Sequence, residues 1–291
     1  MYADILAYYA NPRVKAEIAE YCRNRWVAVH CERTAKNGRF ILLRYYKGKP
    51  LTISNPEDVD FILKKFKTLK PRAFYATANL YFKNSYRDNV LDYFKNVYAR
   101  TMFWDIDSKL EWWRVALKIA RAIVQLLETH GVRESVYLKW SGRGLHVHLH
   151  EKSISARLYS KISPLDLTYS LVEYITIKCQ RKLNEINTRE NTTIKVENLM
   201  DPQRIFVVPL SLHRVLYVSC VVFTPEDIDS FDPSWLNPRN YRHQRIWKNF
   251  KEGEADELAL KAIKIVGGYP KHLLVKKKKK PLEDQIRKYL P

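Results

Sequence analysis

The stretch SGRGLHVHLH, residues 141 to 150, constrains the fold more than any other part of the chain. Its last six residues alternate apolar side chains with His146, His148 and His150, which predicts a β-strand with one apolar and one polar face. The whole chain has only 8 glycines in 291 residues, and two of them flank Arg143 just before this strand. Glycines allow a tight turn whose N–H groups face a ligand, so this turn with its arginine indicates an anion-binding site.

Apolar periodicity elsewhere predicts a chain that mixes helices and strands without an internal repeat. Helices are expected in the first 30 residues and over residues 55–68, 111–129 and 164–188. Strands are expected over residues 25–31, 39–46, 73–82, 100–107, 135–140, 192–198, 204–209 and 216–223. After residue 233 the sequence becomes polar and irregular.

A second candidate site is FWDID, residues 103 to 107. In a strand Asp105 and Asp107 point to the same side, while Trp104 and Ile106 point into the core. Two neighbouring carboxylates repel each other, and a divalent cation such as Mg²⁺ relieves that repulsion. Carboxylates that hold metal beside substrate phosphates are typical of nucleotidyl transfer, although two surface aspartates that end a strand would give the same pattern.

A third segment, residues 193 to 213, places acidic and basic residues after another apolar strand. Glu197 ends that strand, and Asp201 follows in the next turn. Either acid could supply a further metal ligand, and Asp201 could instead cap a turn or form an ion pair. Arg204 and His213 are candidates for phosphate binding.

The charge of the chain favours a polyanionic partner. There are 51 Lys and Arg residues against 31 Asp and Glu residues, a formal charge of +20, which favours nucleic acid over a membrane surface. No apolar run is long enough to span a membrane. The four cysteines lie far apart, so neither a zinc ribbon nor a disulfide framework is expected, and a reducing, cytoplasmic location fits best.

Taken in order, these segments resemble the motif series of the archaeo-eukaryotic primase superfamily, above all that of the catalytic small subunit of DNA primase. The resemblance runs from about residue 20 to 235 and rests on DxD, on SGRGxH, and on an acid followed by an arginine and PxSLH. Residues 72–83 and the FDP at 231–233 also resemble family segments. The resemblance implies a mixed α/β (α+β) fold, namely a primase catalytic core with strands that cradle the active site and helices that flank it.

The resemblance also implies which candidate residues bind metal and which bind the nucleotide. Two Mg²⁺ or Mn²⁺ ions would be held by Asp105, Asp107 and Glu197, or by Asp201 in place of Glu197. The nucleoside triphosphate would be held by Ser141, Gly142, Arg143, His146, Arg204, Ser211 and His213. His148 would stand behind this site or contact a primer phosphate, and His150 would lie on the surface. Three histidines at alternate strand positions span roughly 13 Å, too far to share one zinc ion.

The expected function is that of a DNA primase catalytic subunit, which makes short RNA or DNA primers on a single-stranded DNA template from nucleoside triphosphates. A primase large subunit is the expected partner, and no membrane is involved. The alternatives are a primer-extending or repair polymerase of the same superfamily, or an inactive nucleic-acid-binding subunit. Residues 1–270 would form one catalytic domain with a helical segment at about 151–190, followed by a basic tail at 271–291.

The sequence departs from the family pattern in several places. No cysteine occurs between residues 108 and 140, where the family often has a zinc module, so no structural zinc is expected. Val207 stands where the family has a second phosphate-binding arginine, which predicts weaker triphosphate binding unless Arg214 or another base compensates. The TG pair that commonly follows SLH is also absent.

Overall fold

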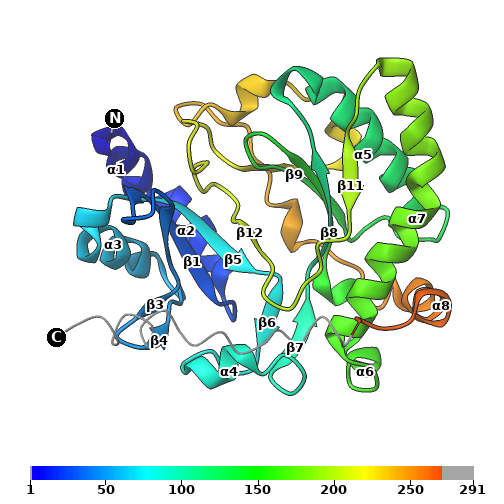
Figure 1. Cartoon of the computed structure of the whole chain (residues 1–291), viewed down its shortest axis with the longest axis horizontal. Helices are drawn as coiled ribbons and strands as arrows, with labels where there is room; N and C mark the ends of the chain where they lie inside the picture. Colours follow the sequence, from blue (N-terminus) through cyan, green and yellow to red (C-terminus); the bar gives the residue numbers. More distant parts are fainter. Residues whose placement is uncertain (1, 271–291) are drawn as a thin grey trace.

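Two antiparallel sheets lie side by side in the computed structural model, which describes residues 2–270 (Figure 1). The first sheet has the strand order β12 (Ile205–Val207), β5 (Pro71–Thr77), β1 (Val27–Thr34) and β2 (Phe40–Leu43). The second sheet has the order β11 (Lys195–Glu197), β8 (Met102–Asp107), β10 (Leu145–Leu149), β9 (Val136–Trp140) and β13 (Val221–Phe223). Two short ladders join β3 (Tyr45–Tyr46) to β4 (Lys49–Pro50) and β6 (Asn79–Tyr81) to β7 (Val97–Arg100).

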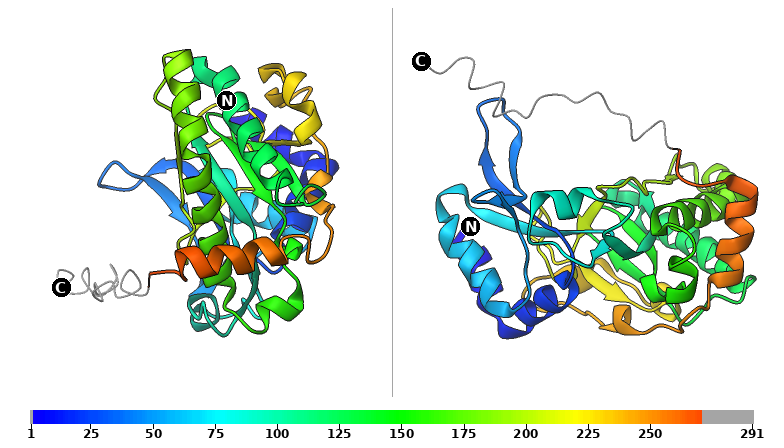
Figure 2. Two further views of the ribbon diagram at one scale, coloured as in Figure 1. Left: turned by 90° about the vertical axis from the view of Figure 1, so that its right-hand side faces the viewer. Right: turned by 90° about the horizontal axis from the view of Figure 1, so that it is seen from below.

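Helices flank both sheets. Those beside the first sheet are α1 (Tyr2–Ala10), α2 (Pro12–Cys22) and α3 (Pro56–Lys65), and α5 (Trp113–Glu128) and α7 (Pro164–Glu190) cover one face of the second. In α5 the residues buried against β8 and β10 recur at helical spacing, as its amphipathic sequence requires. Figure 2 shows α8 (Asp256–Val266), in orange, packed against α7. The short helices α4 (Arg87–Leu91) and α6 (Ala156–Tyr159) lie at the lower edge of Figure 1.

The register of the second sheet aligns polar residues from four strands. Asp105 of β8 pairs with Glu197 of β11 on one side and with His146 of β10 on the other. His146 in turn pairs with Lys139 of β9. Directly paired residues point to the same face of a sheet, so these four side chains form one line, called here the polar row. Trp104 points to the opposite face, where its indole N–H donates to the carbonyl of Val172 in α7 at 3.1 Å.

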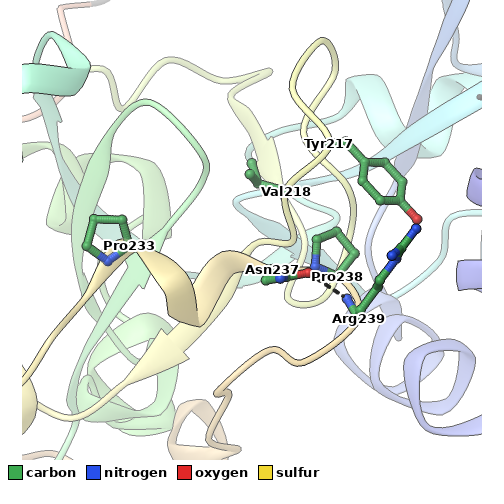
Figure 3. Close-up of a pocket in the computed structure, with 6 residues that line it drawn as sticks. All are labelled: Tyr217, Val218, Pro233, Asn237, Pro238 and Arg239. Carbon is green, nitrogen blue, oxygen red and sulfur yellow. Dashed lines mark hydrogen bonds between the residues drawn. The ribbon is translucent and has the colours of Figure 1, made fainter.

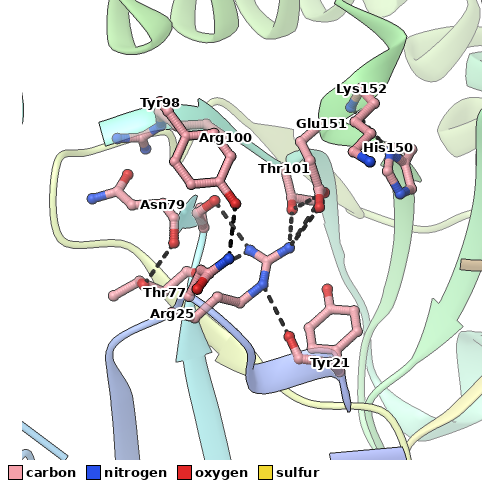
Figure 4. A network of polar contacts seen from close by, with 12 residues as sticks. Tyr21, Arg25, Thr77, Asn79, Tyr98, Arg100, Thr101, His150, Glu151 and Lys152 are labelled. Carbon is pink, nitrogen blue, oxygen red and sulfur yellow. Dashed lines mark hydrogen bonds and ion pairs between the residues drawn. The ribbon is translucent and has the colours of Figure 1, made fainter. Parts of the chain in front are cut away.

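A buried ion pair joins the two sheets (Figure 4). The guanidinium of Arg25, 3 % exposed, lies 3.2 Å from the carboxylate of Glu151 and donates to Thr101 Oγ1 at 2.8 Å. The same guanidinium donates to the carbonyl of Thr77 in β5 at 3.0 Å. Burial alone would raise the pKa of Glu151, but the charge of Arg25 outweighs it and lowers that pKa to about 2. The contact therefore fixes β5 relative to the strands that carry the polar row.

Most of the helices and strands expected from the sequence are present, and three differences stand out. The N-terminal helix is divided at Pro12, which starts α2 after the capping residue Asn11. The polar stretch after residue 233 contains α8, which the sequence pattern did not reveal. His150 is buried rather than on the surface, because its ring stacks on Phe250 with the centroids 4.6 Å apart.

Two expectations concern the chain as a whole. The expected basic tail at 271–291 lies outside the described residues. In the part of the chain that the structure describes, no helix has the length and hydropathy needed to cross a membrane.

Candidate active site

Asp105 is the centre of the polar row and is held by two basic side chains. His146 Nε2 lies 3.2 Å from Asp105 Oδ1, and Arg204 Nη2 donates to Oδ2 at 3.0 Å. Burial by itself raises the pKa of Asp105, but His146 and Arg204 more than offset it, so that pKa lies below its usual value. Asp105 is therefore a carboxylate at neutral pH. The sequence analysis placed all three residues in one site, and the structure brings them into contact.

Two further carboxylates lie next to Asp105. Asp107 follows it on the same face of β8, and Glu197 lies directly opposite it in β11. Burial, then the charge of Asp105, and more weakly that of Glu197, raise the pKa of Asp107. Repulsion among these three groups is the condition that a bound divalent cation relieves.

The glycine-rich turn lies between Asp105 and His213. Its backbone N–H and hydroxyl at Ser141 both donate to the carbonyl of Gly144, at 2.9 and 3.1 Å. Gly142 has a φ of +122°, and a Cβ there would lie 2.8 Å from the His213 ring. A Cβ on Gly144 would lie 3.8 Å from Asp105 Oδ1. The glycines thus allow the turn to fit against the histidine on one side and the carboxylate on the other.

His213 presents a neutral ring with a defined tautomer. Its Nδ1 accepts from the backbone N–H groups of Leu216 and Val215, at 3.0 and 3.2 Å, which leaves the hydrogen on Nε2. Burial and then the charges of Arg214 and Arg143 lower the pKa of His213 to about 4. His213 is therefore a hydrogen-bond donor at neutral pH. Arg143 is exposed at the tip of the turn and is free to meet an anion.

Two residues named from the sequence stand apart from the polar row. Ser211 is fully buried, and its hydroxyl accepts from the N–H of Phe74 at 2.7 Å and donates to the carbonyl of Leu212 at 3.1 Å. These bonds attach the PxSLH segment to β5. The carboxylate of Asp201 accepts from the N–H of Gln203 at 2.8 Å, and so shapes the loop before β12. By position, Glu197 rather than Asp201 is the acid beside Asp105.

Lys139 is a functional candidate that the sequence analysis missed. It is fully buried at the end of the polar row, and its Nζ donates to the carbonyl of Val207 at 2.9 Å. Desolvation lowers its pKa to about 7. Through this bond β9 places a basic side chain against β12. The available signal was a single lysine within the apolar strand VYLKW, two residues before Ser141.

His148 is buried beneath the polar row, on the same face of β10 as His146. Its ring stacks between Tyr137 and Phe103, with centroids 4.8 and 5.5 Å away. Neither ring nitrogen has a hydrogen-bond partner among the described residues, and burial holds its pKa well below the usual value. His148 is therefore an uncharged packing element beneath the polar row.

The donor groups at this site suit Mg²⁺ or Mn²⁺. Within residues 2–270, no group of three or more His, Cys, Asp or Glu side chains is arranged to hold a metal ion unaided. Mg²⁺, however, is commonly held by one or two carboxylates together with water and substrate phosphates. Asp107 and Glu197 are exposed, and Asp105 has its oxygens on His146 and Arg204. This open set of carboxylates fits a metal that arrives with its phosphate-bearing substrate.

A separate pocket lies beside the loop that follows His213. It has a volume of about 410 Å³ and is lined by the six residues in Figure 3: Tyr217, Val218, Pro233, Asn237, Pro238 and Arg239. No carboxylate is among these residues, so this pocket offers no acidic metal ligand.

Comparison with known proteins identifies the fold. No family model and no curated protein matches the chain. Among solved structures, it is similar to the polymerase domain of Ligase D from Mycobacterium tuberculosis, determined in complex with DNA. That match has 13 % identity, covers 92 % of this chain and 90 % of that one, and has a TM-score of 0.53. The chain therefore shares the fold of that domain. The mixed α+β fold predicted from the sequence is thereby confirmed.

A second structure was also found. The primase-polymerase (AEP) domain of cyanophage S-2L aligns over 78 % of this chain and 96 % of that one, with 13 % identity and a TM-score of 0.34.

Proposed function

We propose that this chain is a template-directed nucleotidyltransferase of the primase-polymerase type, and specifically a DNA primase catalytic subunit. The observation that carries the proposal is the convergence of three carboxylates, Asp105, Asp107 and Glu197, with the glycine-rich turn and the neutral donor His213. Carboxylates beside a phosphate-binding turn are the arrangement that phosphoryl transfer requires.

We assign triphosphate binding and metal binding to different parts of the site. The turn with Arg143, together with His213 Nε2–H, would bind the triphosphate, because both offer donors to phosphate oxygens. Arg204 would shift from Asp105 to the substrate, since the metal that Asp105 then helps to hold replaces its positive charge. When bound, Mg²⁺ or Mn²⁺ would activate the attacking hydroxyl and steady the leaving pyrophosphate.

The charge of the chain supports a nucleic-acid template. A formal charge of +20 attracts a phosphate backbone, and 19 Tyr, 11 Phe and 7 Trp residues include exposed rings on which unpaired bases could stack. The resemblance described above favours single-stranded DNA as template, with a large subunit that assists initiation.

A second candidate is a polymerase of the same superfamily that only extends a primer. It is favoured by the structural likeness to the Ligase D polymerase domain. Both candidates need the same carboxylates and triphosphate site, so only the products distinguish them.

The test uses purified protein, labelled nucleotides and Mg²⁺ or Mn²⁺, with single-stranded DNA supplied either bare or primed. New oligonucleotides on bare template would support priming, whereas extension of the supplied primer alone would support the second candidate. Asp107→Asn should abolish either activity, and Asp201→Asn serves as the matched control. Tight DNA binding without incorporation under any condition would overturn both and leave a non-catalytic binding subunit.

A further inference from the structure

We propose that a pocket between the β6–β7 ladder and α6 binds an unpaired stretch of nucleic acid, well away from the carboxylates. This inference rests on the proposed function, because it assigns a second contact to the same template or product strand. The pocket has a volume of about 570 Å³ and is lined by residues of β7, of α6 and of the first turn of α7. Figure 1 shows β7 and α6 near the lower edge of the molecule.

Aromatic rings form one wall of this pocket. Phe82 and Phe94 line it and are 69 % and 47 % exposed, which leaves much apolar area facing solvent. The ring of Tyr98 lies 5.1 Å from that of Phe82, centroid to centroid, and the two planes are inclined at 45°. Clustered exposed rings of this kind mark a binding surface rather than a core.

Positive charge accompanies the rings. Lys95 and Lys161 are exposed and line the pocket, and none of its described lining residues is acidic. The helix α7 also begins at this pocket, with Pro164, and adds the partial positive charge of a helix N-terminus. Rings with neighbouring ammonium groups match the bases and phosphates of a single strand, whereas an apolar peptide would leave the lysines without a partner.

The position of the pocket suits a strand that also passes the active site. Tyr98 in β7 and Asp105 in β8 are seven residues apart, so their separation is at most roughly 23 Å along extended chain. A stacked strand rises about 3.4 Å per nucleotide, so about seven nucleotides would bridge this distance. A single strand of about seven nucleotides is therefore long enough to reach both sites.

The experiment measures the binding of fluorescently labelled single-stranded DNA of increasing length by anisotropy. The variants are Phe82→Ala/Phe94→Ala and, as a matched control, Phe61→Ala, whose ring is also 47 % exposed but lies on α3. For long strands we expect the double variant to bind at least about fivefold more weakly, since one base–ring stack contributes that much or more. Phe61→Ala should bind like the wild type.

A second variant and a second measurement keep the result interpretable. Lys95→Gln/Lys161→Gln should make the binding constant fall less steeply with salt concentration, by the amount expected for the loss of up to about two phosphate contacts. Photo-crosslinking of DNA that carries iodouracil should label a peptide within residues 82–98. Equal binding by the double variant and Phe61→Ala, with no crosslink in that peptide, would overturn the inference.

The proposed function is tested separately by the wild type alone, on a primed template too short to reach the pocket. If the wild type incorporates nucleotides on this short template, and long strands bind Phe82→Ala/Phe94→Ala as tightly as the wild type, only the proposal of a second site is overturned. If no template supports incorporation, but long strands still bind more weakly to Phe82→Ala/Phe94→Ala, only the proposed polymerase function is overturned.

Discussion

Glu197 lies directly opposite Asp105 in the antiparallel pairing of β11 with β8, so the two carboxylates share one face of the second sheet. The sequence alone left Glu197 and Asp201 as rivals for the third acidic position. The register favours Glu197, because the carboxylate of Asp201 shapes its own loop by accepting from the N–H of Gln203 at 2.8 Å.

Replacement of this acid should separate the two rivals. We expect Glu197→Gln to lower nucleotide incorporation at least about 10- to 100-fold, the range seen even for groups just outside a metal's ligand shell. Asp201→Asn should keep most of the activity. Steady-state incorporation at several Mn²⁺ concentrations measures both variants. A larger loss for Asp201→Asn than for Glu197→Gln would contradict the assignment.

A methyl group at Gly142 should disturb the triphosphate site from behind. Gly142→Ala would place its Cβ 2.8 Å from the His213 ring and would also strain a backbone with φ of +122°. We expect the KM for nucleotide to rise at least about tenfold, because a displaced donor weakens triphosphate binding. Gly131→Ala is the control, since its φ is +76° but nothing lies within 4 Å of its Cβ. An unchanged KM for Gly142→Ala would show that the turn does not position His213.

The buried pair of Arg25 and Glu151 should dominate the acid stability of the fold. Removal of one partner, in Glu151→Gln, is expected to lower the free energy of unfolding by about 3 to 5 kcal/mol at neutral pH. Glu134→Gln, which removes an exposed partner 3.7 Å from Lys251, should cost less than about 1 kcal/mol. Urea denaturation of both variants measures these differences.

The difference in the free energy of unfolding between the wild type and Glu151→Gln should depend on pH in one direction. The folded-state pKa of Glu151, about 2, lies below its ordinary value of 4.5. The stabilisation is therefore complete above pH 4.5 and is lost as the pH falls from there towards 2. If the difference in free energy of unfolding between the wild type and Glu151→Gln stayed constant over this pH range, the ion pair of Arg25 with Glu151 would be contradicted.

Burial of Lys139 should destabilise the fold, whereas the ionised Glu151 stabilises it. Its folded-state pKa of about 7 lies below the ordinary 10.5, so the unfolded chain binds the extra proton between these values and stability rises with pH across that window. We expect Lys139→Met to be more stable than the wild type below pH 7, by a gain that shrinks as the pH approaches 10.5. The same variant should lose nucleotide affinity. A gain in stability that grew with pH would contradict the burial of a titrating lysine.

The periodicity of the sequence was enough to place the main donor groups. Alternation in FWDID and LHVHLH assigned Asp105, Asp107 and His146 to polar strand faces, and the structure pairs these strands in register. The pairing of β11 with β8 was not visible, because it joins segments about ninety residues apart and depends on how α7 returns the chain.

Depth of burial was the other property that periodicity could not supply. A period of two indicates which face a residue occupies but not what covers that face. His150 is covered by Phe250 and Lys139 by β12, and both covering segments come much later in the chain. The lysine in the apolar strand VYLKW was visible in the sequence, but its burial against Val207 was not.

The most direct test of the site is the equilibrium binding of a non-hydrolysable nucleoside triphosphate, measured by calorimetry with Mn²⁺ and again with EDTA. We expect binding that requires the metal and that weakens at least about tenfold in Asp107→Asn, with Asp201→Asn unchanged. Binding of equal strength with and without metal, or unaltered by Asp107→Asn, would contradict a metal–triphosphate site on the polar row.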